Sequence, residues 1–314
     1  MRALITGGRG FVGHWLARAL LERGDAVDLA GVIDSTETTA GERAARWMVA
    51  DMRSGDDVEA MVEWSRPDVV FHLAGVSFQP DADRSPVTAY DVNALGVVRL
   101  LTAIARRRAA GTLDPVVLVA GTAMQYGQHS AEEMPLVETA AQRPPTVYAA
   151  SKAAQEIAAL QAAMSSGVRV VCTRSFNHSG RGQPGQFLIP SLVARVRRIQ
   201  RGEIRMLQLG NDVIRDFLHV DDAVSAYLHL VDRGRTGEVY NVCSGTGVSA
   251  RHLAERVLLR TGVAADISTE PSLVRATDVP VLVGSPTKLQ RDTGWAPRKT
   301  HDDIIDDLLH ATTD

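Results

Sequence analysis

Short apolar runs alternate along the first half of the chain with longer stretches whose apolar residues recur every three or four positions. The short runs predict buried strands and the longer stretches predict amphipathic helices. Strands that alternate with helices form a parallel sheet covered by helices on both faces. The predicted fold class is therefore α/β with a doubly wound parallel sheet. The expected strands are 3–6, 26–33, 69–74, 116–120 and 168–173, and the expected helices are 11–23, 58–65, 94–107 and 149–164.

The alternation stops after Arg174. A glycine-rich stretch at 180–185 precedes a predicted helix at 187–201, and strand-like and helix-like pieces of mixed spacing follow. We therefore expect residues 1–173 to form one unit, to which 211–242 returns. Residues 174–314 mainly form a smaller, discontinuous lobe of mixed α/β structure.

Composition excludes several classes of protein. The 314 residues are 45% hydrophobic and 23% charged, which is typical of a globular enzyme, and the net charge of −3 predicts no nucleic-acid partner. Two cysteines, Cys172 and Cys243, are too few for a disulfide framework and are expected to be buried and reduced. Because no signal peptide and no apolar run of ~20 residues is visible, we expect a cytoplasmic protein without membrane contact. No metal-binding cluster is predicted.

A glycine-patterned loop lies between the first predicted strand and the first predicted helix. Gly7 allows a tight turn, Gly10 a close approach of the backbone to a pyrophosphate, and Gly13 close packing of the helix on the strand. Phe11 and Val12 open that helix, whose N-terminus would face the phosphates. The motif predicts a dinucleotide-binding domain of the NAD(P)-binding Rossmann type.

The end of the second predicted strand bears on the choice of coenzyme. It reads Ala30-Gly31-Val32, without the acidic residue that normally holds the ribose 2′-hydroxyl of NAD. A 2′-phosphate has room there, and Arg9 in the glycine loop is a charged partner for it. NADP(H) is therefore favoured, and Asp34 a few residues on keeps NAD(H) possible.

Tyr148 and Lys152 form the main catalytic candidate. Their spacing of four places both side chains on one face of the predicted helix, where an ammonium group lowers the pKa of a phenol. A phenol with a lowered pKa can donate and accept protons at neutral pH.

Several motifs in a fixed order resemble the extended short-chain dehydrogenases/reductases that act on nucleotide sugars. Within that family, the GDP-4-keto-6-deoxy-D-mannose reductases are most similar and the GDP-mannose 4,6-dehydratases next. The motifs are the glycine loop, Asp51-Met52, His72-Leu73-Ala74-Gly75, Asn93, Thr122, Tyr148 with Lys152, 174–183, 215–222, 240–245 and 294–297.

The resemblance implies roles for individual residues. Tyr148 would be the acid/base, Lys152 would hold the nicotinamide ribose, and Thr122 would bind the reacting sugar oxygen. Further coenzyme contacts are implied for Asp51, Met52, Leu73, Ala74, Gly75 and Asn93. The implied substrate contacts are Asn177, Phe187, Leu188, Arg215 and Arg275. Residues 1–173 would then bind the dinucleotide and 174–314 the nucleotide sugar.

The reaction depends on the residues after Thr122. Related 4,6-dehydratases carry a glutamate two residues later as the base for the C5 proton, and here that position is Met124. This favours an NADP(H)-dependent reductase of a nucleotide-linked 4-keto-6-deoxy sugar, with GDP as the favoured nucleotide. The alternatives are a nucleotide-sugar 4-epimerase, a GDP-mannose 4,6-dehydratase that recruits Glu132 or Glu133, and a non-catalytic dinucleotide sensor.

The chain departs from the pattern of the relatives at three positions. Gly121 stands where relatives often have serine, Gln125 stands where valine is usual before Tyr126-Gly127, and Val147 precedes Tyr148 where proline is common.

Relatives commonly form homodimers through two long helices, here 94–108 and 149–164. The small residues Ala103, Ala149, Ala150 and Ala153 would allow two such helices to approach closely.

Overall fold

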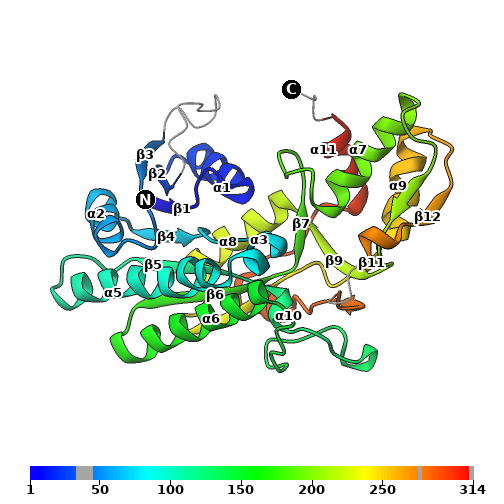
Figure 1. Ribbon diagram of the computed structural model, residues 1–314. Coiled ribbons are helices and arrows are strands. Elements are labelled where there is room, and N and C mark those ends of the chain that lie inside the picture. Colours follow the sequence, from blue (N-terminus) through cyan, green and yellow to red (C-terminus); the bar gives the residue numbers. More distant parts are fainter. Residues whose placement is uncertain (33–44, 275–277, 311–314) are drawn as a thin grey trace.

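The computed structural model describes residues 1–32, 45–274 and 278–310. Its centre is a seven-stranded sheet, wholly parallel, that runs in the order β10-β6-β5-β4-β1-β2-β3 (Figure 1). The strands are β1 (Arg2–Thr6), β2 (Ala26–Gly31), β3 (Arg46–Val49), β4 (Val69–His72), β5 (Val116–Thr122), β6 (Arg169–Ser175) and β10 (Glu238–Val242). The predicted doubly wound sheet is confirmed, although the short strand β3 was not predicted.

Helices cover both faces of this sheet, each over its own apolar core. On one face lie α1 (Phe11–Glu22) and α8 (Val220–Arg233), and on the other lie α2 (Gly55–Ser65), α5 (Gly96–Ala109) and α6 (Val147–Ser166). Short helical pieces precede α5 and another follows β10: α3 (Gln79–Arg84), α4 (Pro86–Tyr90), the π-helical turn η1 (Asp91–Leu95) and α10 (Thr287–Thr293). Because the core strands are buried on both faces, their sequences are continuous apolar runs.

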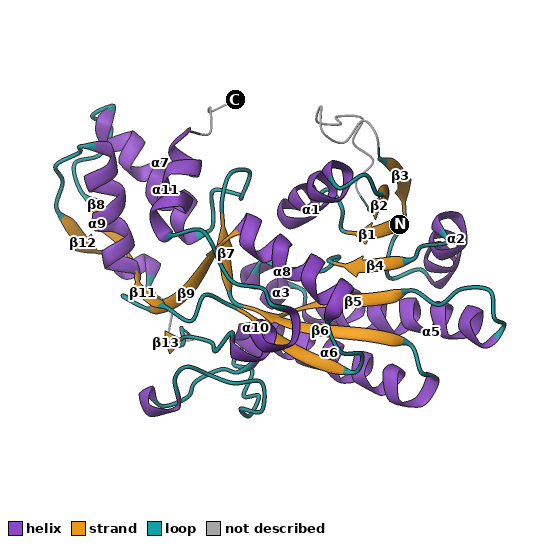
Figure 2. Ribbon diagram, turned by 180° about the vertical axis from the view of Figure 1, so that it is seen from behind, coloured by secondary structure: helices purple, strands orange, loops and turns teal. Residues whose placement is uncertain are grey.

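The second lobe lies beyond the end of the large sheet (Figure 2). It contains a four-stranded mixed sheet of β7 (Asn177–Ser179), β9 (Ile214–His219), β11 (Gly247–Ser249) and β13 (Val281–Leu282). A small pair joins β8 (Leu207–Leu209) to β12 (Ile267–Thr269), followed by the turn η4 (Pro271–Leu273). Helices α7 (Leu188–Gln200), α9 (Ala250–Thr261) and α11 (His301–His310) enclose its apolar core.

The segment 211–242 is shared between the two lobes. Strand β10 pairs with β6 in the large sheet, and α8 packs against β5 and α1. Strand β9, which opens the segment, instead pairs with β7, β11 and β13 in the four-stranded sheet. The division of the chain into two functional domains stays a prediction.

Cys172 and Cys243 are both buried and free, as predicted. Burial raises the pKa of each thiol.

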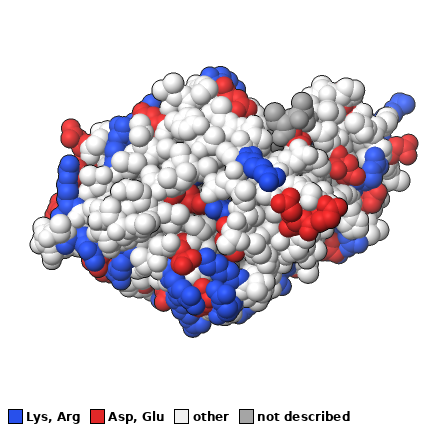
Figure 3. All heavy atoms as spheres, turned by 90° about the horizontal axis from the view of Figure 1, so that it is seen from below, with Lys and Arg blue, Asp and Glu red and all other residues white. Residues whose placement is uncertain are grey.

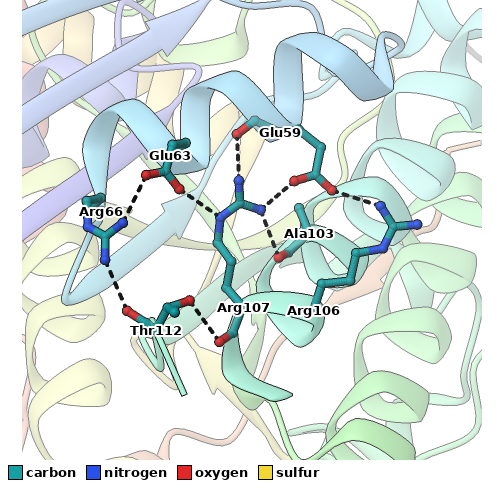
Figure 4. A network of polar contacts seen from close by, with 7 residues as sticks. All are labelled: Glu59, Glu63, Arg66, Ala103, Arg106, Arg107 and Thr112. Carbon is teal, nitrogen blue, oxygen red and sulfur yellow. Dashed lines mark hydrogen bonds and ion pairs between the residues drawn. The ribbon is translucent and has the colours of Figure 1, made fainter. Parts of the chain in front are cut away.

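Paired charges join α2 to α5 on the surface (Figure 4). Arg107 donates to the main-chain oxygen of Glu59 at 3.1 Å and to the carboxylate of Glu63 at 3.4 Å, and Arg106 donates to the Glu59 carboxylate at 3.1 Å. Arg106 and Arg107 therefore lie at a charged end of α5 that faces acidic side chains of α2. Exposed ion pairs of this kind contribute about 0–1 kcal/mol each, so the network aligns the helices more than it stabilises them.

Residues 86–109 form one continuous helical stretch that is long and apolar enough, by length and composition, to cross a membrane. Half of its apolar window is buried, and α5 packs against α2 and α6. This is the environment of a core helix. The cytoplasmic location stays a prediction.

The outer surface of α5 and α6 differs from the expected small-residue face. Ala103, Ala149 and Ala153 are buried within the subunit, whereas Ala150 is half-buried. Three of the four small residues are therefore not on an exposed face, and the dimer stays a prediction. The large apolar residues exposed on α5 and α6 are instead Val98, Ile157 and Met164.

Candidate active site

A cleft of about 510 Å³ opens at the carboxyl ends of β1, β4, β5 and β6. It lies where the strand order reverses between β1 and β4, the position at which open α/β sheets bind ligands. Residues from both lobes line it. The predicted site residues among its walls are Gly7, Gly10, Phe11, Val12, Gly13, Leu73, Ala74, Gly75, Thr122, Tyr148, Lys152, Asn177 and Phe187.

The glycine loop has the geometry that the sequence predicted. Gly7 has a φ of +68°, and a Cβ there would lie 2.8 Å from the Ala74 nitrogen. A Cβ on Gly13 would lie 2.6 Å from the carbonyl oxygens of Gly7 and Gly8, so only glycine lets α1 begin this close to the loop. The residues present therefore fit a dinucleotide, whose pyrophosphate needs a bare backbone before a helix N-terminus.

Arg9 lies at the outer end of the loop. Its guanidinium carbon is 4.0 Å from the centre of the Trp47 ring, a cation–π contact that holds the charge in place. Asp51 forms an ion pair with Arg53 at 2.6 Å, and Met52 is buried. Arg9, Asp51 and Met52 lie outside the walls of the cleft, so their contacts with a coenzyme stay predictions. Asp34 lies outside the described residues.

Asn93 has a positioning role. Its Oδ1 accepts from the Val76 nitrogen at 2.8 Å, and its Nδ2 donates to the Val76 oxygen and to Ser151 Oγ. The buried amide therefore ties the segment after β4 to α6. It supports Leu73, Ala74 and Gly75 from behind.

Thr122 and Tyr148 meet at the base of the cleft. Thr122 ends β5 and caps the 3-10 turn η2 (Ala123–Gln125), and Tyr148 lies in the first turn of α6. Burial raises the pKa of Tyr148 to about 12, although a hydrogen bond with the Thr122 side chain opposes the rise. At neutral pH the phenol is therefore protonated, which suits a proton donor.

Lys152 lies one turn after Tyr148, as predicted, but its ammonium group has other partners. Nζ donates to the Ala120 carbonyl and to Gln155 Oε1, each at 2.8 Å. The expected lowering of the Tyr148 pKa by Lys152 is therefore wrong for this geometry. Burial lowers the pKa of Lys152 itself to about 7.

This titration predicts a pH-dependent stability. Between pH 7 and 10.5 the unfolded chain binds a proton on Lys152 that the folded chain does not, so the free energy of unfolding rises with pH in this window. Lys152→Met removes the penalty, and it should gain relative to the parent by a few kcal/mol at most near pH 6 and by nothing near pH 10.5. Urea unfolding of both proteins at several pH values measures this difference. A gain independent of pH would contradict the titration.

The predicted substrate residues are only partly brought together. Asn177 and Phe187 line the cleft from the second lobe. Leu188 begins α7 and packs toward the core of that lobe. Arg215 is buried in β9, outside the cleft walls, where it donates to the Ile214 carbonyl at 3.0 Å. Arg275 lies outside the described residues.

Two further residues line the cleft. Tyr227 of α8 reaches it with its hydroxyl 2.8 Å from Ser175 Oγ. His178 stacks on Phe11 with ring centres 6.2 Å apart, which joins the glycine loop to the second lobe. His178 belongs to the 174–183 motif and follows Asn177, whereas Tyr227 lies outside every motif of the resemblance.

The walls of the cleft show whether a carboxylate base for dehydration is present. Met124 lines the cleft at the position where a dehydratase carries glutamate. Glu132 and Glu133 lie exposed in the turn η3 (Ala131–Glu133), and Glu133 contacts the His129 ring at 2.9 Å. Among the described residues that line the cleft, none is Asp or Glu.

The chain is similar to several enzymes that are named for nucleotide sugars. A sequence model for a family described as GDP-mannose 4,6 dehydratase matches residues 4–308. GDP-6-deoxy-D-mannose reductase of Pseudomonas aeruginosa is 38% identical over 236 residues, which cover 74% of this chain and 76% of that protein. The structure of RMD from Pseudomonas aeruginosa complexed with NADPH has a TM-score of 0.82 and 31% identity, covering 98% of both chains. UDP-glucose 4-epimerase of Thermus thermophilus, in complex with NAD, has a TM-score of 0.86 and 27% identity, covering 99% of this chain and all of that one.

Proposed function

Since the chain belongs to the GDP-mannose 4,6-dehydratase family, we propose that it reduces the C4 keto group of a nucleotide-linked 4-keto-6-deoxy sugar. GDP is the favoured nucleotide and NADP(H) the favoured coenzyme, in line with the named reductase and the NADPH complex among its relatives. The observation that carries the proposal is a cleft with a protonated tyrosine, a threonine and a lysine, but no carboxylate among its described walls.

Each catalytic candidate in the cleft has its own role in such a reduction. When bound, the nicotinamide supplies a hydride to the carbonyl carbon. Tyr148 donates its proton to the carbonyl oxygen as that oxygen gains charge, and water returns the proton afterwards. Thr122, on the adjoining strand end, orients the same oxygen by a hydrogen bond. Lys152 would hold the nicotinamide ribose.

Dehydration needs an additional base for the C5 proton, and a 4-epimerase must keep its oxidised coenzyme bound while the keto sugar rotates before the hydride returns. The deciding assay supplies GDP- and UDP-hexoses and their 4-keto-6-deoxy derivatives, with and without NADPH. Consumption of one NADPH for each keto sugar supports the proposal. Interconversion of hexoses without net consumption identifies an epimerase, and a 4-keto-6-deoxy product from GDP-mannose identifies a dehydratase.

The coenzyme preference rests on Arg9. A guanidinium stacked on Trp47 is suited to a ribose 2′-phosphate, which NADPH has and NADH lacks. Arg9→Ala should raise the Kd of NADPH about tenfold, the effect of losing about 1.4 kcal/mol, and change that of NADH less than threefold. Fluorescence titration measures both constants, with Arg18→Ala on the exposed face of α1 as the control. Equal losses for the two coenzymes would refute the role of Arg9.

We also propose a homodimer that forms through α5 and α6. On the face shown in Figure 3, where α6 lies, a broad area carries no charged side chain, and the two charged residues of α6 are buried. Ile157 is 65% exposed and Met164 is 89% exposed on this surface, as expected for residues covered by a second copy. Sedimentation velocity at micromolar concentration should show a dimer, and Ile157→Lys should shift it to a monomer. A monomeric parent protein would refute the assignment.

A further inference from the structure

A buried polar network lies behind Thr122, on the side away from the cleft. Gln125 has no exposed surface, and its Oε1 accepts from the Thr122 nitrogen at 2.9 Å. In return, Thr122 Oγ1 accepts from the Met124 nitrogen at 3.3 Å, which completes a capping box around η2. The Met124 N–H occupies one lone pair of Oγ1, and the same hydroxyl lies within hydrogen-bonding reach of the Tyr148 side chain.

The orientation of Gln125 is set from behind by an ion pair. Its Nε2 donates to Glu156 Oε2 at 2.9 Å, and Glu156 also accepts from Arg174 Nη2 at 2.7 Å. Gln142 Nε2 donates to the other carboxylate oxygen at 2.6 Å. An ionised carboxylate only accepts hydrogen bonds, so Gln125 must turn its NH₂ toward Glu156 and its oxygen toward Thr122.

Gly121 leaves the space that this arrangement occupies. A Cβ at position 121 would lie 2.7 Å from Gln125 Oε1 and 2.3 Å from the Thr173 carbonyl oxygen of β6. Both contacts are shorter than van der Waals packing allows, so a serine would displace the glutamine, the strand or both. Two of the departures from the usual family pattern, Gly121 and Gln125, are therefore one coupled feature of this chain.

We propose that Gln125 is a positioning residue for Thr122, held by the Glu156–Arg174 ion pair and accommodated by Gly121. It keeps the Thr122 hydroxyl aimed at the carbonyl oxygen of the sugar without touching substrate or coenzyme. The proposal rests on the proposed reduction, in which Thr122 binds that oxygen.

Gln125→Leu has nearly the same volume and lacks the amide that bonds Thr122, Glu156 and Gln142. We expect kcat for the keto sugar to fall about 10- to 100-fold, the scale of a misplaced reacting group, while the Kd of NADPH changes less than twofold. Gln142→Leu is the matched control, since Gln142 binds the same carboxylate and accepts only a long hydrogen bond of 3.4 Å from Gln125, without contacting Thr122. It should lower Tm but keep kcat within threefold. A Gln125→Leu enzyme that is folded and keeps kcat within threefold overturns the proposal.

A charge swap gives a readout that a merely structural role would not move. In Gln125→Glu two carboxylates face each other and share a proton, so kcat should fall as pH rises from 6 to 9, relative to the parent. The double variant Gln125→Glu/Glu156→Gln restores one donor facing one carboxylate, and kcat should return to within about fivefold of the parent. A double variant that regains Tm but not kcat overturns the proposal.

The outcomes separate this proposal from the proposed function. A parent enzyme that turns over no nucleotide sugar refutes the reduction. The positioning of Thr122 is then decided by a crystal structure of Gln125→Leu: a displaced Thr122 main chain supports it, and an unmoved one overturns it.

Discussion

Tyr148→Phe should lower kcat for the keto sugar by about 10²- to 10⁴-fold, the range for loss of a general acid. The variant keeps the ring that packs in the cleft wall and loses only the hydroxyl that donates the proton. The Kd of NADPH should change less than threefold, since the phenol acts on the sugar oxygen. Steady-state kinetics and fluorescence titration measure the two quantities.

Tyr227→Phe is the matched control for Tyr148→Phe. Tyr227 also lines the cleft, but its hydroxyl is bound to Ser175 at 2.8 Å. Loss of the Tyr227 hydroxyl should lower kcat less than tenfold. Equal effects of the two substitutions would mean that the cleft needs both hydroxyls for its shape. Parent-level turnover by Tyr148→Phe would show that Tyr148 is not the proton donor. A non-catalytic dinucleotide sensor would show NADPH binding without turnover in every variant.

The spacing of four placed Tyr148 and Lys152 on one helix face, and the family resemblance implied that Thr122 joins them; simple geometry agrees with both. Two residues four apart share a helix face, and the carboxyl ends of parallel strands meet at one edge of the sheet. Neither argument needs knowledge of tertiary packing. The same holds for the glycine loop, where the requirement for a bare backbone is local.

The partners of the Lys152 ammonium group and the direction of the Tyr148 pKa shift could not be predicted from residue spacing. The ammonium of Lys152 is bound by Gln155 and by the Ala120 carbonyl of β5, and the burial that raises the Tyr148 pKa comes from several segments. The network behind Thr122 likewise joins Gln125 to Glu156 and Arg174 across the fold. Spacing in the sequence carries no information on such contacts.

The second lobe was predicted least well. Its strands have two to six residues, and they pair in a mixed sheet whose register no repeating pattern indicates. Arg215 illustrates the consequence. The resemblance implied a substrate contact for Arg215, which lies in the buried strand β9, outside the cleft walls, so that contact stays a prediction.

Arg174→Met should be strongly destabilising, costing about 3–5 kcal/mol in the free energy of unfolding. The side chains of Arg174 and Glu156 are 6% and 4% exposed, and they form two hydrogen bonds of 2.9 and 2.7 Å. Although burial opposes it, bonding to Glu156 raises the pKa of Arg174 further above its usual value. Methionine fills much of the same volume but leaves the Glu156 carboxylate buried without its cation. Chemical denaturation at neutral pH measures the loss.

A second substitution separates the lost charge from the lost packing. Arg174→Met/Glu156→Gln removes the carboxylate that Arg174→Met leaves buried without its cation, so its deficit in the free energy of unfolding should be smaller than that of Arg174→Met. Equal deficits of the two variants would mean that the lost energy is packing rather than an uncompensated charge.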